Sequence, residues 1–261
     1  MEAYKRVQLA RKKNRPTSLD YIDHIFSDFI ELHGDRQFAD DPSMITGLGF
    51  LMDMPVTIIA QERGKNTKSK VRRNFGSSHP EGYRKALRQM KLAEKFNRPI
   101  VCFIDTSGAY CGIGAEERGQ GHAIASNLMA MMTLRVPIIS IVIGEGGSGG
   151  ALALGVADEV WMLENAIYSV ISPEGCASIL WKDASHTKEA ATHLKLTAPD
   201  LKELKVIDQI ITESHRDFKY IFSELQVNLY QTFLKNTKIT VDELLDRRYQ
   251  RFRQYGQVTD I

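Results

Sequence analysis

The chain has 261 residues, 43% of them hydrophobic and 25% charged, and a formal net charge of +2. This length can bury the full core of an α/β domain, and the composition excludes a disordered or fibrous protein. No apolar run reaches the roughly 20 residues of a membrane span and no secretory signal is recognisable, so we expect a cytoplasmic protein without membrane contact, while the small charge argues neither for nor against nucleic acid.

The first predicted elements are a basic arm, a helix and two strands. Residues 5–15 are rich in Lys and Arg, which is typical of a frayed or partner-bound arm. Thr17 begins a capping pattern, and apolar residues then recur at helical spacing until Gly34, a natural helix end. Short apolar segments at 45–51 and 55–60 predict two strands.

The middle of the chain alternates strands and helices. The polar, basic segment 65–73 is predicted as a loop, and Pro80 begins an amphipathic helix. Strands are predicted at residues 99–104, 138–143 and 159–163. The first strand is followed by a helix at about 115–134, the second by a short helix that begins just after residue 149, and the third by a helix that ends at residue 181. This alternation implies parallel strands with helical crossovers, and ligands bind such sheets at the carboxyl ends of the strands.

The C-terminal part is predicted to be helical. Residues 218–233 form an amphipathic pattern, and Thr240 caps a last helix that ends in a strongly basic run. No Pro-, Gly- or Ser-rich linker divides the chain, so we expect a single domain. Its expected parts are an N-terminal helical region at about 1–44, a core at 45–212 and C-terminal helices at 213–261.

The most informative segment is the glycine-rich stretch 144–154, which follows a β-branched run typical of a buried strand. A second glycine-rich loop, 107–114, ends the preceding predicted strand, so both loops are expected to face one pocket. A strand that passes through glycines into a helix leaves several backbone N–H groups unpaired. With the positive end of the helix dipole, these groups stabilise an anion, and glycine allows it to approach closely.

One interpretation of this stretch is a dinucleotide site. Gly144-x-Gly146-x-x-Gly149 matches the fingerprint, and Glu164 lies about 20 residues further on, at the end of a predicted strand. However, the segment leaves only a short helix before the next strand, which disfavours a nucleotide-binding βαβ unit.

Two further interpretations concern acyl chemistry. Gly146-x-Ser148-x-Gly150 matches a nucleophile elbow, with Asp208 and His215 downstream as examples of an acid and a base. Alternatively, no side chain acts as a nucleophile, and the backbone N–H groups of Gly149 and Gly150 form an oxyanion hole. The second alternative explains five glycines in seven positions better than a single exposed serine does.

Longer motifs now point to one family. In order along the chain they are Asn74-Phe75-Gly76 and the segments 80–88, 114–120, 144–154 and 169–182. The chain closely resembles the α subunits of bacterial acetyl-coenzyme A carboxylase carboxyltransferase, from about Arg15 to Gly256, in a short form without the long N-terminal extension of some relatives.

The resemblance implies a crotonase-like α/β fold, a superhelix of ββα units with helical N- and C-terminal extensions. It implies transfer of a carboxyl group from carboxybiotin to acetyl-coenzyme A, which gives malonyl-coenzyme A for fatty acid biosynthesis. The biotin belongs to the biotin carboxyl carrier protein, not to this chain. The implied assembly is α₂β₂ with a carboxyltransferase β subunit, and biotin carboxylase joins the full complex.

The resemblance also assigns roles to residues. The backbone N–H groups of Gly149 and Gly150 would hold the ureido oxygen of biotin, and a second oxyanion hole on the β subunit would hold the thioester enolate. Biotin then takes the proton itself, so no His or carboxylate is needed as a base. The β subunit carries the structural zinc and most of the acyl-coenzyme A site. Further substrate- or carrier-binding candidates in the two loops are Gly108, Ala109, Tyr110, Gly146 and Gly147.

Several side features bear on the site. Ser107 and Cys111 stand where relatives carry proline, which predicts a looser first loop. Two interpretations remain open for the basic residues Lys68, Lys70, Arg72 and Arg73. They form a solvated surface, or they attract the phosphates of coenzyme A or an acidic carrier domain. The three cysteines have no CxxC spacing, so we expect no metal in this chain. Glu116, Glu117 and Glu145 are interpreted as structural, because a carboxylate would repel a developing oxyanion.

Overall fold

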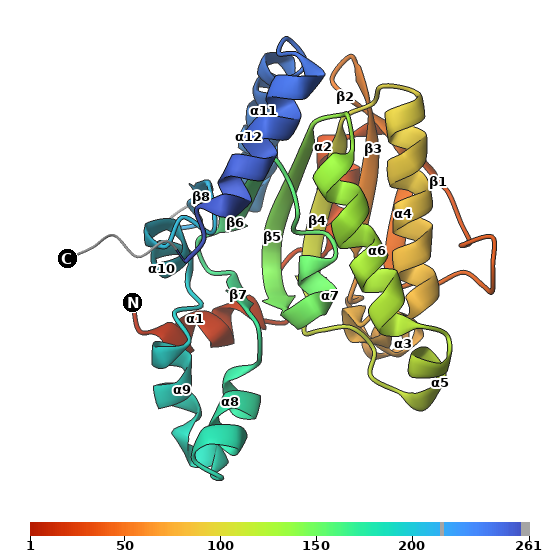
Figure 1. Ribbon diagram of the computed structural model, residues 1–261. Coiled ribbons are helices and arrows are strands. Elements are labelled where there is room, and N and C mark those ends of the chain that lie inside the picture. Colours follow the sequence, from red (N-terminus) through yellow and green to blue (C-terminus); the bar gives the residue numbers. More distant parts are fainter. Residues whose placement is uncertain (215–216, 257–261) are drawn as a thin grey trace.

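The structure, a computed structural model, describes residues 1–214 and 217–256 and is built around one sheet (Figure 1). The strand order is β1-β2-β3-β4-β5-β6-β8, and β7 pairs with β5. The strands are β1 (Ser27–Glu31), β2 (Met44–Leu51), β3 (Met54–Gln61), β4 (Ile100–Thr106), β5 (Ile138–Gly147), β6 (Glu159–Leu163), β7 (Ile167–Ser169) and β8 (Gln209–Ile211).

Helices cover the sheet and extend beyond it. Figure 1 shows α4 and α6 in front of the sheet, and α8 and α9 projecting away from it. The helices are α1 (Ala3–Ala10), α2 (Ser18–Ile25), α3 (Thr67–Arg72), α4 (Pro80–Lys95), α5 (Ile113–Glu117), α6 (Gln120–Thr133), α7 (Ser148–Leu152), α8 (Pro173–Leu180), α9 (Thr187–His193), α10 (Ala198–Glu203), α11 (Phe218–Asn236) and α12 (Val241–Arg253), with 3₁₀ turns η1 (Asn74–Gly76) and η2 (Ala184–His186). Across the two described ranges, no helix has the length and apolarity of a membrane span.

The predicted parallel sheet is confirmed. β3, β4, β5, β6 and β8 pair in parallel, whereas β1, β2 and β3 are antiparallel. β4 is buried at every residue and β5 at all but its last. Strands buried on both faces are continuous apolar runs, which is why residues 138–143 were recognisable from the sequence. The parallel order brings the ends of β3, β4 and β5 to one edge.

Local start signals of three helices are also confirmed. Thr17 caps α2 together with Asp20, and Pro80 occupies the first turn of α4. The hydroxyl of Thr240 accepts a hydrogen bond from the N–H of Glu243 at 3.2 Å, at the start of α12. Such caps act within four residues, so the sequence alone is sufficient to predict them.

The prediction of one helix up to Gly34 is wrong. α2 ends at Ile25, and the chain continues as β1, which pairs with β2 so that Ile30 lies opposite Leu48. The apolar spacing of the segment fits either structure over so few residues. The strand is decided by a pairing partner about 20 residues away.

Residues 5–15 were predicted as a frayed or partner-bound arm, and a frayed arm is wrong, while partner binding stays a prediction. Residues 3–10 form α1, whose Val7 and Ala10 are buried in a small cluster with Ala191 and Leu196. Arg6 is buried too, and its guanidinium donates to the carbonyl of Glu164. Distant parts of the chain therefore cover the apolar face of this segment and Arg6, whereas Lys5, Lys12 and Lys13 are exposed.

The basic segment 65–73, predicted as a loop, contains α3. The side chain of Asn66 accepts a hydrogen bond from the N–H of Ser69 at 2.9 Å and caps this helix. Lys and Arg are good helix formers, so a charged segment with such a cap becomes helical. The predicted helix 115–134 is instead two helices, α5 and α6, separated by Gly119 with φ of +80°.

A buried lysine beside the sheet gives the fold a pH dependence. The ammonium of Lys85, which is fully buried, lies 2.5 Å from a carboxylate oxygen of Asp40. Partial burial alone would raise the pKa of Asp40, but the hydrogen bond from Lys85 lowers this pKa to about 2 from its usual 3.8. Because the folded-state pKa is depressed, the pair stabilises the fold above pH 3.8 and loses this contribution as the pH falls toward 2.

We therefore expect Asp40→Asn to flatten the acid dependence of stability. The free energy of unfolding of the wild type should fall more steeply between pH 4 and pH 2.5 than that of the variant, as measured by urea unfolding at each pH. The matched control is Asp23→Asn, which removes an exposed carboxylate without a hydrogen bond or ion pair in the described residues. Parallel pH curves for Asp40→Asn and the wild type would contradict the assignment.

Candidate functional site

The glycine-rich stretch 144–154 divides between a strand and a helix. Its first part, through Gly147, continues β5 beyond the predicted strand end. The chain turns at Ser148, where φ is +53°, and α7 begins there. A left-handed backbone is strained at a serine. The turn places Gly149 and Gly150 in the first turn of α7, the first half-buried and the second buried.

The N–H groups of Gly149 and Gly150 have no hydrogen-bond acceptor within residues 1–214 and 217–256. The first N–H groups of a helix have no partner inside the helix, so an outside acceptor must satisfy them. Two neighbouring donors of this kind can hold one anionic oxygen. The turn can therefore stabilise an oxygen on which negative charge develops.

The two glycine-rich loops lie against each other. A Cβ on Gly147 would overlap the carbonyl of Ser107, and one on Gly150 would lie 2.7 Å from the carbonyl carbon of Gly108. Glycine is needed at both positions because two backbones approach without room for a side chain. Ser107, Gly146 and Gly147 line one small cavity of about 20 Å³.

The first loop is anchored although its two expected prolines are replaced. The N–H of Tyr110 donates to the carbonyl of Ser78 at 3.1 Å, and Nε2 of Gln120 donates to the carbonyl of Tyr110 at 2.8 Å. Ala109 follows Gly108 toward this anchor, and Cys111 beyond it is exposed. Greater mobility of this loop stays a prediction.

Gln61, the last residue of β3, fixes the start of α7. Its Nε2 donates to the carbonyl of Gly150 at 2.7 Å, and the side chain is fully buried. The hydroxyl of Tyr83 lies 3.5 Å from the same carbonyl, and burial raises the pKa of Tyr83, so the hydroxyl keeps its proton. The sequence analysis did not assign these two residues to the site, because nothing local connects them to Gly150.

An apolar cavity of about 410 Å³ opens beside the glycine turn. Ser148 and Gly149 form part of its wall, together with side chains that the sequence analysis did not single out: Leu152, Tyr168, Val170, Leu201, Phe252 and Tyr255. Phe252 is an apolar residue among the arginines at the end of α12, which was the available signal for its role. The volume lies within the range of small-molecule sites, roughly 300–1,000 Å³.

Charged residues near the turn neutralise one another. Glu145 pairs with Arg11 and with Arg63, each at 2.8 Å, and Arg63 also pairs with Asp105 at 3.4 Å. Burial raises the pKa of Asp105, while Arg63 opposes that shift. Glu145 is thus held as a buried ion pair, whereas Glu116 and Glu117 are exposed on α5.

The side chains proposed for the alternative chemistries are engaged elsewhere. Asp208 accepts hydrogen bonds from the N–H of Val160 at 2.7 Å and from Arg251 at 2.8 Å. His215 lies outside the described residues. Glu164, the expected ribose ligand, accepts hydrogen bonds from Ser214, and α7 has only five residues. The dinucleotide interpretation therefore lacks both a free carboxylate and a full crossover helix.

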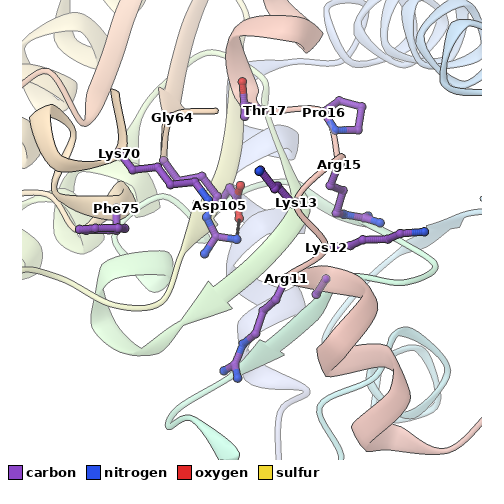
Figure 2. Close-up of a pocket in the computed structure, with 12 residues that line it drawn as sticks. Arg11, Lys12, Lys13, Arg15, Pro16, Thr17, Gly64, Lys70, Phe75 and Asp105 are labelled. Atoms are coloured by element: carbon purple, nitrogen blue, oxygen red, sulfur yellow. Dashed lines mark ion pairs between the residues drawn. The ribbon is translucent and has the colours of Figure 1, made fainter. Parts of the chain in front are cut away.

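The basic residues of α3 do not converge on the glycine turn. Lys68 and Arg72 are exposed, with no ion pair in the described parts of the chain, and Arg73 donates to the carbonyl of Pro42 at 2.6 Å. Lys70 instead lines a separate cavity with the N-terminal segment (Figure 2). Outside the undescribed residues, no group of His, Cys, Asp and Glu has a metal-binding arrangement.

Comparison with known sequences gives consistent matches over nearly the whole chain. The family described as acetyl co-enzyme A carboxylase carboxyltransferase-like matches residues 1–256. A protein of Ruminiclostridium cellulolyticum named acetyl-coenzyme A carboxylase carboxyl transferase subunit alpha is 62% identical over 259 residues, 99% of this chain and 100% of the relative. A protein of Natranaerobius thermophilus named acetyl-coenzyme A carboxylase carboxyl transferase subunits beta/alpha is 59% identical. The match covers 97% of this chain and 43% of the relative.

Solved structures share the fold at low sequence identity. A transcarboxylase 12S structure superposes with a TM-score of 0.68 at 22% identity and covers 86% of this chain. This chain spans only 43% of that transcarboxylase chain. A chain of a Pseudomonas malonate decarboxylase hetero-tetramer superposes with a TM-score of 0.65 at 16% identity, over 83% of this chain and 89% of its own. The expected crotonase-like fold is confirmed by these likenesses.

Proposed function

The chain belongs to the family of acetyl-coenzyme A carboxylase carboxyltransferase α subunits, and from this premise we propose that its glycine turn is the carboxyl-donor half of the active site. The protein transfers a carboxyl group to acetyl-coenzyme A, which forms malonyl-coenzyme A. The observation that carries the proposal is the pair of N–H groups, on Gly149 and Gly150, that has no acceptor in the described residues, at a turn where Gly149 lines an apolar cavity.

The two N–H groups act on the ureido oxygen of biotin. When bound, biotin would supply the carboxyl group, and Gly149 and Gly150 would hold its ureido oxygen, where negative charge would develop. Gly149 and Gly150 donate hydrogen bonds to this oxygen, and the bonds strengthen as the charge develops. Because α7 holds the donors in place beforehand, no reorganisation is needed at the moment of transfer.

The apolar cavity supports this assignment by its size and chemistry. Leu152, Val170 and Phe252 offer an apolar surface to a ring system and its aliphatic chain, and the polar donors lie at one side. Burial raises the pKa of Tyr168 to about 12, so this residue does not act as a base near neutral pH. Residues of the chain would therefore bind and polarise the cofactor, and bound biotin would supply the group that accepts the proton.

The proposed partners follow from the family and from exposed apolar side chains. A carboxyltransferase β subunit completes the site in an α₂β₂ assembly and contributes most of the acyl-coenzyme A site. A relative that joins the two subunits in one chain supports this pairing. The biotin carboxyl carrier protein brings biotin to the turn, and biotin carboxylase completes the complex. Val170, Ile113 and Met129 are each at least 75% exposed and are available to a partner.

A serine hydrolase is the second candidate, and one observation favours it. Ser148 is exposed and has the positive φ that is typical of a nucleophile elbow. Replacement by alanine separates the two functions. We expect Ser148→Ala, mixed with a cognate β subunit and biotin, to keep malonyl-coenzyme A decarboxylation within a few-fold of the wild type, because the N–H donors remain. Thioester hydrolysis by the chain alone that falls more than 10³-fold in kcat on the same replacement would instead establish a nucleophile.

We expect a charge in the apolar cavity to weaken biotin binding. Leu152→Asp should raise the KM for free biotin by at least tenfold, because a carboxylate would have to be desolvated beside an apolar ligand. Steady-state kinetics of the complex with the β subunit measures the effect. The matched control is Val227→Asp on α11, an exposed apolar residue outside the cavity. Equal KM values for both variants would contradict the assignment of the cavity.

A further inference from the structure

A second cavity, of about 120 Å³, lies between the N-terminal segment and α3. Figure 2 shows it with residues of the segment between α1 and α2 on one side and Lys70 and Phe75 on the other. Lys13 is directed toward the side where Lys70 and Asp105 lie, whereas Lys12 points away. This cavity and the apolar one beside Gly149 have no lining residue in common.

The arginines of this cavity are neutralised, but its two facing lysines are not. Arg63 pairs with Asp105 and Glu145, and Arg15 pairs with Glu213 at 2.6 Å. Within the described ranges, the ammonium groups of Lys13 and Lys70 make no hydrogen bond or ion pair. Two uncompensated positive charges that face one small space favour a group with two negative charges over a single carboxylate.

A strained turn places an exposed aromatic residue, Phe75, in the wall of the cavity. Asn74, Phe75 and Gly76 all have positive φ, of 45°, 55° and 85°. The turn is fixed against β4, since a Cβ on Gly76 would lie 2.7 Å from the carbonyl oxygen of Asp105. Phe75 is nonetheless 55% exposed, so packing does not explain the strain. Strain of this kind at a binding pocket indicates a functional position for the side chain.

The size of the cavity limits the ligand. A volume of about 120 Å³ is well below that of sites for whole small molecules, roughly 300–1,000 Å³, but accommodates one phosphate group. A base joined to this phosphate would lie outside the cavity, where the ring of Phe75 offers a flat surface for stacking. The charges, the volume and the aromatic ring together match one ligand chemistry.

We propose that this cavity binds the phosphate group of a nucleotide, with Lys13 and Lys70 as its ligands and Phe75 stacked on the base. A phosphate monoester carries nearly two negative charges and three acceptor oxygens, which suits two lysine ammonium groups. Two sources have this chemistry. One is the 3′-phosphoadenosine end of an acyl-coenzyme A, which rests on the proposed function, and the other is a free nucleotide.

Binding is tested by calorimetry on the full chain with adenosine 3′,5′-bisphosphate as the probe. We expect Lys13→Gln/Lys70→Gln to weaken binding at least tenfold, because each charge-assisted contact contributes about that factor. The control, Lys5→Gln/Lys91→Gln, removes two exposed lysines outside the cavity and should bind like the wild type. Phe75→Leu should weaken the bisphosphate but leave the affinity for inorganic phosphate unchanged. Equal affinities of the wild type and both double variants would overturn the proposal.

Kinetics of the complex with the β subunit then separates the two sources. If acyl-coenzyme A is the source, Lys13→Gln/Lys70→Gln raises the KM for acetyl-coenzyme A and leaves the KM for its 3′-dephospho analogue unchanged. If a free nucleotide is the source, both KM values stay at the wild-type level while bisphosphate binding is lost. Calorimetry needs no turnover, so a failure of the proposed carboxyl transfer would not affect the binding result.

Discussion

Replacing Gly149 by proline is expected to lower kcat for carboxyl transfer by roughly 10²–10³, the cost of losing one oxyanion donor. Gly149 lies in the first turn of α7, where its N–H has no acceptor in the described residues, so proline removes the donor without breaking a helical hydrogen bond. Proline also disfavours the left-handed conformation of the preceding Ser148, so some loss in the free energy of unfolding is expected and is measured separately from kcat. Decarboxylation of malonyl-coenzyme A by the complex, with thermal unfolding of the same sample, measures both effects.

The control at the same position is Gly149→Ala, which keeps the N–H. A Cβ there would meet only the side chain of Ile124, at 3.8 Å, which is ordinary van der Waals contact. We expect this variant to retain most of the activity. Gly150→Ala is unsuitable for this comparison, since its Cβ would collide with the backbone of Gly108 and Ala109. If the alanine and proline variants at position 149 have the same kcat, the N–H group of Gly149 has no catalytic role.

The second large effect is expected for Arg248→Met, which should lower the free energy of unfolding by about 3–5 kcal/mol, as when one partner of a buried ion pair is removed. Arg248 is fully buried and pairs with Asp158 at 2.7 Å. Its guanidinium also donates to the carbonyls of Met131, Leu134 and Val136. Methionine fills a similar volume but leaves three acceptors and one carboxylate without this donor. Urea unfolding at neutral pH measures the loss.

The neighbouring arginine is the matched control. Arg247 is exposed and pairs with Glu243 one helical turn away, an arrangement that stabilises by about 0.3–0.5 kcal/mol. Arg247→Met should therefore lower the free energy of unfolding by less than about 1 kcal/mol. A similar loss in both variants would show that the buried network of Arg248 contributes no more than a surface pair.

The stability of α12 bears on the site as well. Phe252 in this helix and Tyr255 just after it line the apolar cavity beside the glycine turn. Arg248 joins the same helix to the end of α6 and the segment before β5. Arg248 and Arg251 of the C-terminal basic run are thus buried anchors for one wall of the cavity, whereas Arg247 and Arg253 are exposed.

Short-range signals account for the elements that the sequence predicted well. The buried strands β4 and β5 are continuous apolar runs, and the caps at Thr17, Pro80 and Thr240 act over three or four residues. Where a partner is distant, the prediction was wrong. β1 depends on its pairing with β2, and α1 depends on the cluster that joins Val7 to Leu196.

By itself, the sequence determined the family, the parallel sheet and the position of the glycine turn, because each is written in contiguous residues. The assignment of Gly149 and Gly150 as donors stays a proposal. Only the tertiary structure decided what surrounds that turn: Gln61 on the Gly150 carbonyl, Arg11 and Arg63 on Glu145, and the two cavities. These contacts join segments some 80 to 130 residues apart, and neither burial nor charge compensation is encoded in the neighbours of a residue along the chain.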